Sequence, residues 1–358
     1  MKYVEIYSSL KEDIVKRKFT PERKLPSESE LCLKFKVARN TVRQALSLLA
    51  KQGLIDTIKG KGAFITKRGS RKTGAIGLFI PDYHSASFFA SLKSELEHCA
   101  QNLGYDIHLE NIALKNGILD DDCIRKAARR LAVRRVEGVI FRPLLDKKRI
   151  STNKEILQVF QHTETPVVLI DSDVTIRPER SECDLVAVDN VSAGRRIASH
   201  LLDLGRKRLA FLMSGIEINF NSNWGNRLFG IAGEVAVRGM DNGVQTLRFA
   251  PNDLESLREL FRSRKRPDAI ACGNDNEAHT LIRSLKSIGI RVPEDVAVTG
   301  FDDNPLARSS IPPLTTIQQP VGLIAKTAFK TLLARIRYPQ NDPREILLDA
   351  PLIVRKST

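Results

Sequence analysis

Apolar positions at the start of the chain recur every three to four residues, the period of one face of an α-helix. These positions are Ile6, Leu10 and Ile14, with Val4 and Val15 alongside. They predict an amphipathic helix that ends near Lys18. A second helix is predicted over 28–35, because Ser27 and Glu30 stand in the capping-box relation.

A third helix is predicted to open near Asn40, after a turn at 36–39. Its apolar positions fall on one face: Val42, Ala45, Leu46 and Leu49. Polar side chains lie on or beside the other face: Arg39, Asn40, Thr41, Arg43 and Gln44. Two helices joined by a short turn, the second polar at its N-terminal end, are typical of a helix-turn-helix.

The next stretch, "GLIDTIKGKGAFI", alternates in the manner of a β-hairpin. Strands are predicted at Leu54–Ile58 and Ala63–Thr66. The turn between them contains two glycines and two lysines, Lys59, Gly60, Lys61 and Gly62. Because glycine has no β-carbon, such a turn can approach a phosphate or a minor groove closely. The hairpin is therefore interpreted as a wing beside the helix-turn-helix.

The pattern changes after a basic, glycine- and serine-containing stretch at 66–74, which predicts a domain boundary near residue 70. Beyond it, short fully apolar runs such as "AIGLFI", "GVIF" and "VVLI" alternate with helical stretches. Apolar strands between helices indicate parallel sheets covered on both faces. We therefore expect an α/β body made of two lobes.

Polar residues that follow the apolar runs are the candidates for ligand binding, because ligands of such sheets bind outside the carboxyl ends of the strands. The candidates are Asp82, His84, Arg142, Asp171, Asn274 and Asp302, with Arg227 at the start of a later helix and Phe88 and Trp224 as aromatic neighbours. Carboxylates accept hydrogen bonds from hydroxyls, arginine donates them, and aromatic faces cover the C–H side of a sugar. This set suits a small polyhydroxy ligand.

Charge is distributed unevenly along the 358 residues, whose net charge is +15. Residues 1–72 hold 18 Lys and Arg against 7 Asp and Glu, whereas the other 286 residues hold 39 against 35. A concentrated positive field attracts polyanions, because neutralised phosphates release their counterions. The charge therefore supports DNA as the partner of the N-terminal module.

Other classes of protein fit poorly. No apolar run approaches the roughly 20 residues that span a bilayer. The N-terminal residues lack the pattern of an export signal, so we expect a cytoplasmic protein. The five cysteines are scattered and show no metal-binding spacing, so neither a metal nor a cofactor is expected. No G-x-S-x-G, H-E-x-x-H or phosphate-loop motif is present, which argues against an enzyme.

Residues 3–66 resemble the winged-helix domain of the GntR family of bacterial regulators through "LPSESEL", "VARNTVRQAL", "LAKQGLI" and "KGKGAFI". The resemblance implies that Arg39, Asn40, Thr41 and Arg43 reach the major groove or its phosphates. It places Glu28 and Ser29 at the edge of the second helix, and Gly60 with Lys59 and Lys61 at the minor groove. This chain departs from the family at Lys36, where glycine is usual, and at Ala38, where a hydroxyl residue is usual.

Most of 75–358 resembles the effector-binding domain of the lactose-repressor (LacI) family, which is itself similar to periplasmic sugar-binding proteins. The resemblance lies in "PVVLID", "RLFGI", "PDAIACGND", "IRVPEDVAVTGFDD" and "PPLTTIQQP", among other segments. It implies that Asp171, Arg227, Asn274 and Asp302 contact the effector, with Arg142 and Phe88 as wall residues by location.

The two resemblances imply a particular domain plan. A winged helix-turn-helix domain (1–68) and a linker (69–74) precede an effector-binding domain (75–358). The first lobe of that domain is expected at about 75–188 plus 318–344, and the second at about 191–316 plus 346–358. Chain crossings between the lobes are expected near 189–191, 316–319 and 345.

The resulting hypothesis is a sequence-specific transcriptional regulator, a repressor of sugar-utilisation genes, whose operator affinity is controlled by a small sugar. A homodimer is the minimum expected, since a two-fold pair of reading heads matches a palindrome. The alternative is a sugar-binding, transport-type receptor without DNA function. That alternative leaves the basic N-terminal module without a purpose.

Overall fold

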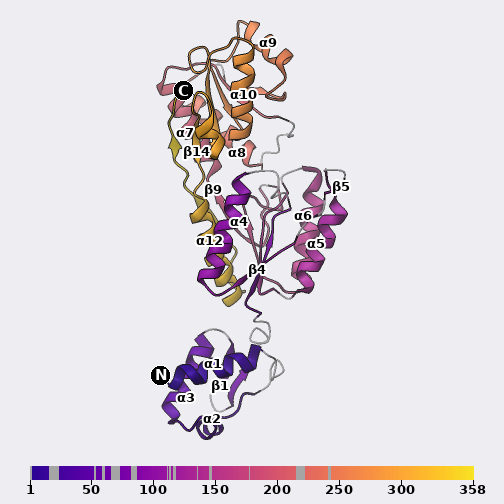
Figure 1. The fold of residues 1–358 in the computed structure, drawn as a ribbon, viewed down its shortest axis with the longest axis vertical. Coiled ribbons are helices and arrows are strands. Elements are labelled where there is room, and N and C mark those ends of the chain that lie inside the picture. The colour runs from indigo at the N-terminus through magenta and orange to yellow at the C-terminus, as the bar shows by residue number, and fades with distance from the viewer. Residues whose placement is uncertain are drawn as a thin grey trace.

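The computed structural model describes residues 2–15, 24–51, 54–58, 61–65, 73–81, 87–110, 112, 114–115, 118–134, 136–144, 147–176, 178–214, 222–240 and 243–358. Figure 1 shows a small helical domain at one end of the long axis, followed by two α/β lobes. Each lobe contains a largely parallel sheet flanked by helices. The predicted mixed α/β architecture is therefore confirmed.

The N-terminal domain contains α1 (Lys2–Val15), α2 (Glu28–Phe35), α3 (Arg39–Lys51), β1 (Ile55–Ile58) and β2 (Gly62–Ile65). The predicted apolar faces meet in one buried core, which includes Ile6, Leu10, Leu31, Val42 and Leu49. The two strands pair antiparallel, as expected for a wing. Helix α3 begins at Arg39, one residue before the predicted start, so this arginine lies in the first helical turn.

The ends of α2 explain the short turn that leads to α3. At its start, the Ser27 backbone N–H donates to Glu30 Oε2 over 2.6 Å, and the Glu30 N–H donates back to Ser27 Oγ over 3.2 Å. This is the predicted capping box. At its end, Lys36 adopts a left-handed conformation with φ of 51° and donates its N–H to the Cys32 carbonyl. A glycine would reach that conformation without the clash of a β-carbon.

The first lobe is built on a six-stranded parallel sheet in the order β15-β9-β8-β7-β3-β4. Helices α4 and α12 cover one face and α5 and α6 cover the other, on opposite sides of the sheet in Figure 1. Its elements are β3 (Ala75–Phe79), α4 (Ser87–Asn102), β4 (Asp106–Leu109), β5 (Leu114–Lys115), β6 (Ile118–Leu119), α5 (Asp121–Val133), β7 (Gly138–Phe141), the 3-10 helix at Lys147–Arg149, α6 (Ile150–His162), β8 (Val167–Ile170), β9 (Asp184–Val188), α12 (Val321–Arg337) and β15 (Glu345–Leu348).

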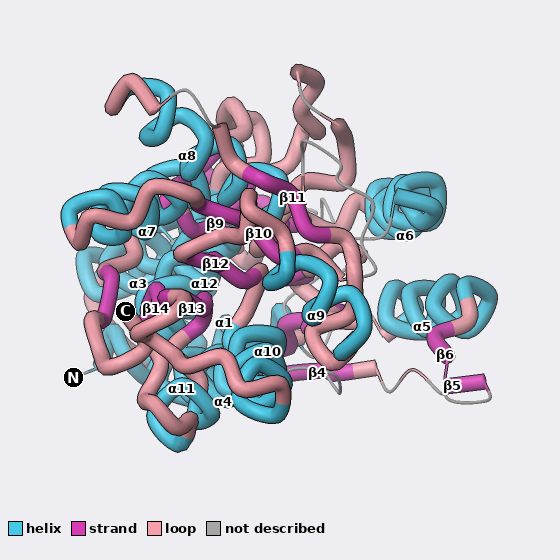
Figure 2. The backbone as a smooth tube through the Cα atoms, turned by 90° about the horizontal axis from the view of Figure 1, so that it is seen from above, coloured by secondary structure: helices cyan, strands magenta, loops and turns pink. Residues whose placement is uncertain are grey.

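The second lobe has a six-stranded sheet in the order β11-β10-β12-β13-β14-β16, in which only β16 runs antiparallel to its neighbour. Helices α7 and α8 pack against each other on one face, and α9 and α10 cover the other. Figure 2 shows these elements from above. They are α7 (Asn190–Asp203), β10 (Leu209–Leu212), α8 (Asn223–Val237), β11 (Gln245–Leu247), α9 (Leu254–Arg262), β12 (Ala269–Cys272), α10 (Asp275–Ser287), β13 (Ala297–Asp302), α11 (Pro305–Ser309), β14 (Thr315–Gln318) and β16 (Leu352–Ile353).

Three chain segments pass between the lobes: after β9 near Asp189, after β14 at 319–320, and between β15 and β16 at 349–351. The first crossing lies where it was predicted. The prediction of a crossing near 345 was wrong, because β15 pairs with β9 and extends the first sheet through Leu348. Likewise, β14 pairs with β13 through Gln318 and so keeps 316–318 in the second lobe. The apolar pattern of a single strand does not show to which of the two sheets that strand belongs.

Among the described residues, no helix is long and apolar enough to cross a membrane.

The left-handed conformation of Lys36 gives the first testable prediction. Replacing Lys36 with glycine should stabilise the N-terminal domain by about 1 kcal/mol, because a β-carbon in this conformation costs roughly that amount. Hydrogen exchange of the buried amides of α2 and α3 in the full chain measures the change. Lys36→Ala is the matched control: it removes the charge and keeps the β-carbon, so it should leave protection unchanged. Equal effects of the two substitutions would contradict the conformational explanation.

Candidate functional site

The exposed face of α3 carries two arginines that share one carboxylate. Arg39 Nε donates to Glu28 Oε2 over 2.6 Å, and Arg43 Nε lies 3.1 Å from both oxygens of the same carboxylate. These two hydrogen bonds lower the pKa of Glu28. The arginine side chains remain 63% and 58% exposed. Glu28 therefore aligns the two guanidinium groups without burying them.

The other residues predicted for this surface lie around that pair. Asn40 and Ser29 are exposed, Thr41 is half-buried, and Lys61 is exposed just before β2. The predicted contacts Lys59 and Gly60 lie outside the described residues. The first turn of α3 thus presents cations and amides to solvent, and these groups can bond phosphates and base edges.

Between the lobes, the position of Arg227 depends on unusually close packing of α7 against α8. A β-carbon on Gly194 would lie 2.2 Å from the Arg227 carbonyl oxygen, and one on Gly230 would lie 2.1 Å from the Val191 carbonyl oxygen. Only glycine permits such an approach of two helix backbones. This contact holds Arg227 beside the carboxyl ends of the strands.

The Arg227 guanidinium is buried, with the residue only 4% exposed. Its Nε donates to Asn190 Oδ1 over 2.8 Å, and Nη1 donates to the Gly273 carbonyl oxygen. Its Cζ lies 3.4 Å from the centre of the Phe301 ring. Burial lowers the pKa of Arg227, while Asp302, Asp171 and Asp275 oppose that shift. Three acidic side chains therefore surround one buried cation.

Asp171 follows β8 and receives hydrogen bonds on both carboxylate oxygens. Arg142 Nε donates to Oδ2 over 3.2 Å, and Asn223 Nδ2 donates to Oδ1 over 2.6 Å. Arg142 itself is buried, with its Cζ 4.1 Å from the centre of the Phe89 ring. Asp171 adopts a φ of 73°, which a residue other than glycine rarely takes. Residues in such conformations are concentrated at functional sites, where surrounding contacts hold them in place.

Asp302, at the end of β13, has a φ of 123° and accepts a 2.6 Å hydrogen bond from Gln319 Nε2. Burial raises the pKa of Asp302 to about 6, against the lowering effect of the Arg227 charge and the Gln319 hydrogen bond. The carboxylate is therefore mostly ionised at neutral pH and can accept hydrogen bonds from a ligand. It becomes neutral as the pH falls through 6.

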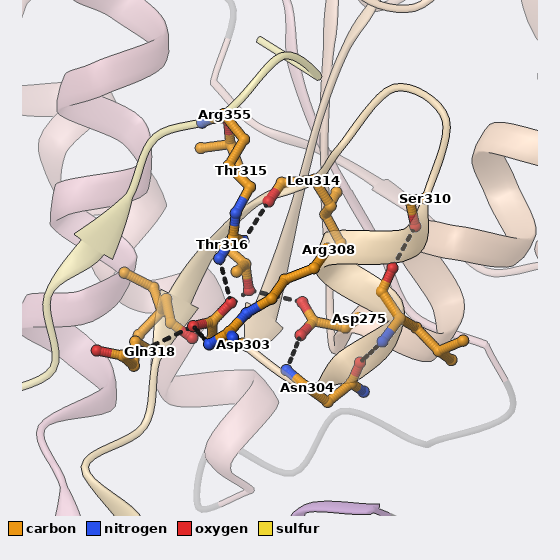
Figure 3. Close-up of polar contacts among 12 residues, drawn as sticks. Asp275, Asp303, Asn304, Arg308, Ser310, Leu314, Thr315, Thr316, Gln318 and Arg355 are labelled. Carbon is orange, nitrogen blue, oxygen red and sulfur yellow. Dashed lines mark hydrogen bonds and ion pairs between the residues drawn. The ribbon is translucent and has the colours of Figure 1, made fainter.

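Behind this carboxylate, Asp275 is completely buried at the start of α10 (Figure 3). Thr316 Oγ1 donates to its Oδ1 over 2.6 Å, and the Asn304 N–H donates to its Oδ2 over 2.8 Å. Burial and the nearby Asp302 raise the pKa of Asp275 to about 8. A β-carbon at Gly300 would lie 2.2 Å from Asp275 Oδ1, so the glycine makes room for this acid.

The remaining residues predicted to bind the ligand make other contacts within the protein or lie outside the described residues. Phe88 packs in the core against Phe89, with ring centres 5.0 Å apart, and it is the Phe89 ring that Arg142 covers. Trp224 is nearly buried, and its ring would lie 2.7 Å from a β-carbon on Gly273. Asn274 caps α10 by accepting the Glu277 N–H. Asp82 and His84 lie outside the described residues.

Sequence reasoning missed three residues that hold the site together: Asn190, Asn223 and Gln319. Each precedes or begins a helix, where amides usually signal only a cap. Their partners Arg227, Asp171 and Asp302 lie 17 or more residues away in the sequence. The expectation that Arg227 opens its helix was also wrong, because α8 begins at Asn223, capped by Ser222. That earlier start brings Asn223 to Asp171. Among the described residues, no three or more His, Cys, Asp or Glu side chains are arranged so that they could hold a metal ion.

Together, the exposed cationic helix of a winged domain and a polar cluster between two α/β lobes define a class: a ligand-responsive, DNA-binding transcriptional regulator. Comparison with known proteins agrees. Residues 2–65 match the family described as bacterial regulatory proteins, gntR family, and residues 198–358 match the periplasmic binding protein-like domain. The chain therefore combines an N-terminal segment that matches the gntR family of bacterial regulators with a later segment that matches the periplasmic binding protein-like domain.

Two relatives are similar over the whole chain. An arabinose metabolism transcriptional repressor of Halalkalibacterium halodurans is 28% identical, covering 100% of this chain and 96% of its own length. One of Geobacillus stearothermophilus is 26% identical, covering 100% and 97%.

Solved structures share the fold. A complex of the transcriptional regulator CelR with cellobiose has a TM-score of 0.67 at 22% identity, over 90% of this chain and 92% of that one. The lac repressor dimer bound to operator and an anti-inducer has a TM-score of 0.65 at 20% identity, over 88% and 98%.

The buried acid Asp275 predicts how stability depends on pH. Its pKa is raised from 3.8 to about 8 in the folded protein, so between these values the folded state keeps a proton that the unfolded chain has released. Its contribution to stability is thus largest below pH 4 and is lost as the pH rises through 8. Asp275→Asn should raise the melting temperature at pH 8 and leave it little changed at pH 4.5. Parallel melting curves of the two proteins across this range would contradict the assignment.

Proposed function

We propose that this protein is a repressor that binds operator DNA through residues 1–68 and a small sugar between the lobes of residues 75–358. The observation that carries the proposal is the similarity of the whole chain, both domains in the same order, to repressors of arabinose metabolism. The site residues are consistent with it, because they combine a DNA-type cationic surface with a sugar-type polar cluster. The genes regulated would serve sugar utilisation.

On the DNA side, the proposal assigns direct contacts to Arg39, Asn40, Thr41 and Arg43. The planar guanidinium of arginine can donate to guanine O6 and N7 together. Ser29, Glu28 and the wing residues Lys59, Gly60 and Lys61 would flank this helix. When DNA displaces Glu28 from the two arginines, the side chains of Arg39 and Arg43 already lie on the exposed face of α3. Little further ordering of these side chains is then needed for DNA binding.

On the effector side, Asp171 and Asp302 would accept hydrogen bonds from sugar hydroxyls, and Arg227 would donate to them. Asn274 adds an amide, and Arg142, Trp224 and the Phe88–Phe89 ring pair would add the surrounding wall. Asp82 and His84 remain ligand residues proposed from the sequence. The two arginines, Arg142 and Arg227, are matched in number by the two acidic side chains Asp171 and Asp302, so neither formal charge is in excess. That balance favours a neutral sugar.

Control of DNA binding would follow from the three crossings between the lobes. A ligand that favours one lobe arrangement changes the placement of subunits in a homodimer, and hence the spacing of two reading heads. A hundredfold change in operator affinity requires about 2.7 kcal/mol of coupling.

Two other roles compete less well. A transport-type sugar receptor would leave the cationic α3 surface unused. An enzyme would need reacting groups, whereas the acids of the cluster are engaged with protein donors. We therefore assign no catalytic activity, and DNA binding implies that the protein acts in the cytoplasm.

The proposed DNA contact is tested with Arg43→Ala. Loss of this guanidinium should weaken operator binding at least tenfold, since a good bidentate contact is worth roughly 1–3 kcal/mol. If Arg43 binds a phosphate, the slope of log affinity against log salt should also fall by about 0.9. Mobility-shift titrations at several salt concentrations measure both. Arg291→Ala, which removes an exposed arginine of the second lobe, is the control. Unchanged affinity for Arg43→Ala would refute the contact.

The proposed effector site is tested with Arg227→Lys and Arg227→Ala. Both should weaken sugar binding in calorimetry, because neither side chain can span Asn190 and the Gly273 carbonyl. Operator binding without sugar should persist. Arg238→Ala at the C-terminal cap of the same helix, where the guanidinium is exposed and pairs with Asp203, is the matched control. Normal sugar affinity in the folded Arg227→Lys protein would rule out the site.

A further inference from the structure

Among the residues that the structure describes, one hydrogen bond of this cluster joins the two lobes directly. Asn223 Nδ2, in the first turn of α8 in the second lobe, donates over 2.6 Å to Asp171 Oδ1, at the end of β8 in the first lobe. The other contacts of the cluster lie within one lobe or involve the crossing segments, as with Gln319 and Asp302. The Asn223–Asp171 bond therefore reports whether the lobes are together, rather than how one lobe is folded.

Each partner of this bond is positioned by its own lobe. On the first-lobe side, Arg142 binds the second oxygen of Asp171 and is itself packed on Phe89. On the second-lobe side, Asn223 is 5% exposed and follows Ser222, whose hydroxyl accepts the Gly225 N–H over 3.0 Å and caps α8. Because the carboxylate of Asp171 and the backbone of Asn223 are positioned by contacts within their own lobes, little further ordering is needed to form the bond.

We infer that Asn223 acts as a latch between the lobes: its bond to Asp171 holds the second lobe against the first, and so sets how much of the protein has the closed lobe arrangement that binds the effector. This inference names Asn223 as a positioning residue for effector binding and rests on the proposed function only for its second test.

Removing the amide should open the lobes. A hydrogen bond to a charged group, once lost, shifts an equilibrium by roughly tenfold or more, so the ratio of closed to open protein should fall by about that factor. An effector that binds only the closed form then shows a weaker apparent affinity, because this affinity is proportional to the fraction of protein that is closed. Asn223→Asp should open the lobes further, because two carboxylates would face each other at hydrogen-bond distance.

The first test needs neither sugar nor DNA. Small-angle X-ray scattering of the full-length protein compares the wild type with Asn223→Ala and Asn223→Asp, and a larger radius of gyration is expected in that order. Asn226→Ala is the matched control: it lies on the same helix, and no hydrogen bond from its side chain is found among the described residues. Equal dimensions of the wild type and both Asn223 variants would overturn the inference.

An exchange of the two side chains guards against simple misfolding. In Asp171→Asn combined with Asn223→Asp, the new amide on β8 can donate to the new carboxylate on α8. The double variant should be more compact than Asn223→Asp alone, and the double-mutant cycle isolates the energy of this pair. A double variant as expanded as Asn223→Asp would show that the cross-lobe bond does not close the protein.

The second test uses sugar. Titration of Asn223→Ala with arabinose and with cellobiose should give a roughly three- to tenfold weaker affinity than the wild type for whichever sugar binds. Sugar should also compact this variant more than the wild type. A tighter affinity would overturn the inference, because Asn223 would then compete with the effector. If neither sugar binds wild type, the choice of effector fails while the scattering result still decides the role of Asn223.

Discussion

The burial of one cation organises the region between the lobes. Arg227 can lie there only because α7 and α8 approach through Gly194 and Gly230 and bring its backbone against the strand ends. A buried guanidinium must be compensated, since an unpaired charge in the interior is very costly. The compensation comes from carbonyl, amide, aromatic ring and carboxylate groups at the ends of several strands and helices. The same groups form the candidate ligand site.

The two domains use arginine in opposite ways. In the N-terminal domain, Arg39 and Arg43 are aligned by Glu28 and remain largely exposed, as is required of groups that meet a large polyanion. Between the lobes, Arg142 and Arg227 are buried and satisfied by protein partners, as suits the proposed contact with a small ligand. The first arrangement favours strong dependence on salt, and the second favours strict geometry.

Much of the fold follows from local patterns. The apolar period of three to four residues placed α1, and the Ser27–Glu30 pair placed the start of α2, because both signals act within a few residues. The two-lobe body was anticipated from apolar runs between helices. The assignment of β15 to the first sheet was not anticipated, because the sequence of a short apolar strand does not identify the strand with which it pairs. For the same reason the sequence did not reveal the role of Asn223, which depends on its contact with Asp171, more than fifty residues earlier in the chain.

Taken alone, the sequence determined the order of the domains, the concentration of positive charge in the first fifth of the chain, and the residues that stand at strand and helix ends. These are properties of spacing and composition, which exist before the chain folds. The tertiary structure decided which of those residues meet. It brought Asp171 to Asn223 across two lobes, gave Asp171 and Asp302 their left-handed conformations, and raised the pKa of the buried Asp275. Such features arise from desolvation and from contacts between distant segments, and neither is encoded in any local stretch.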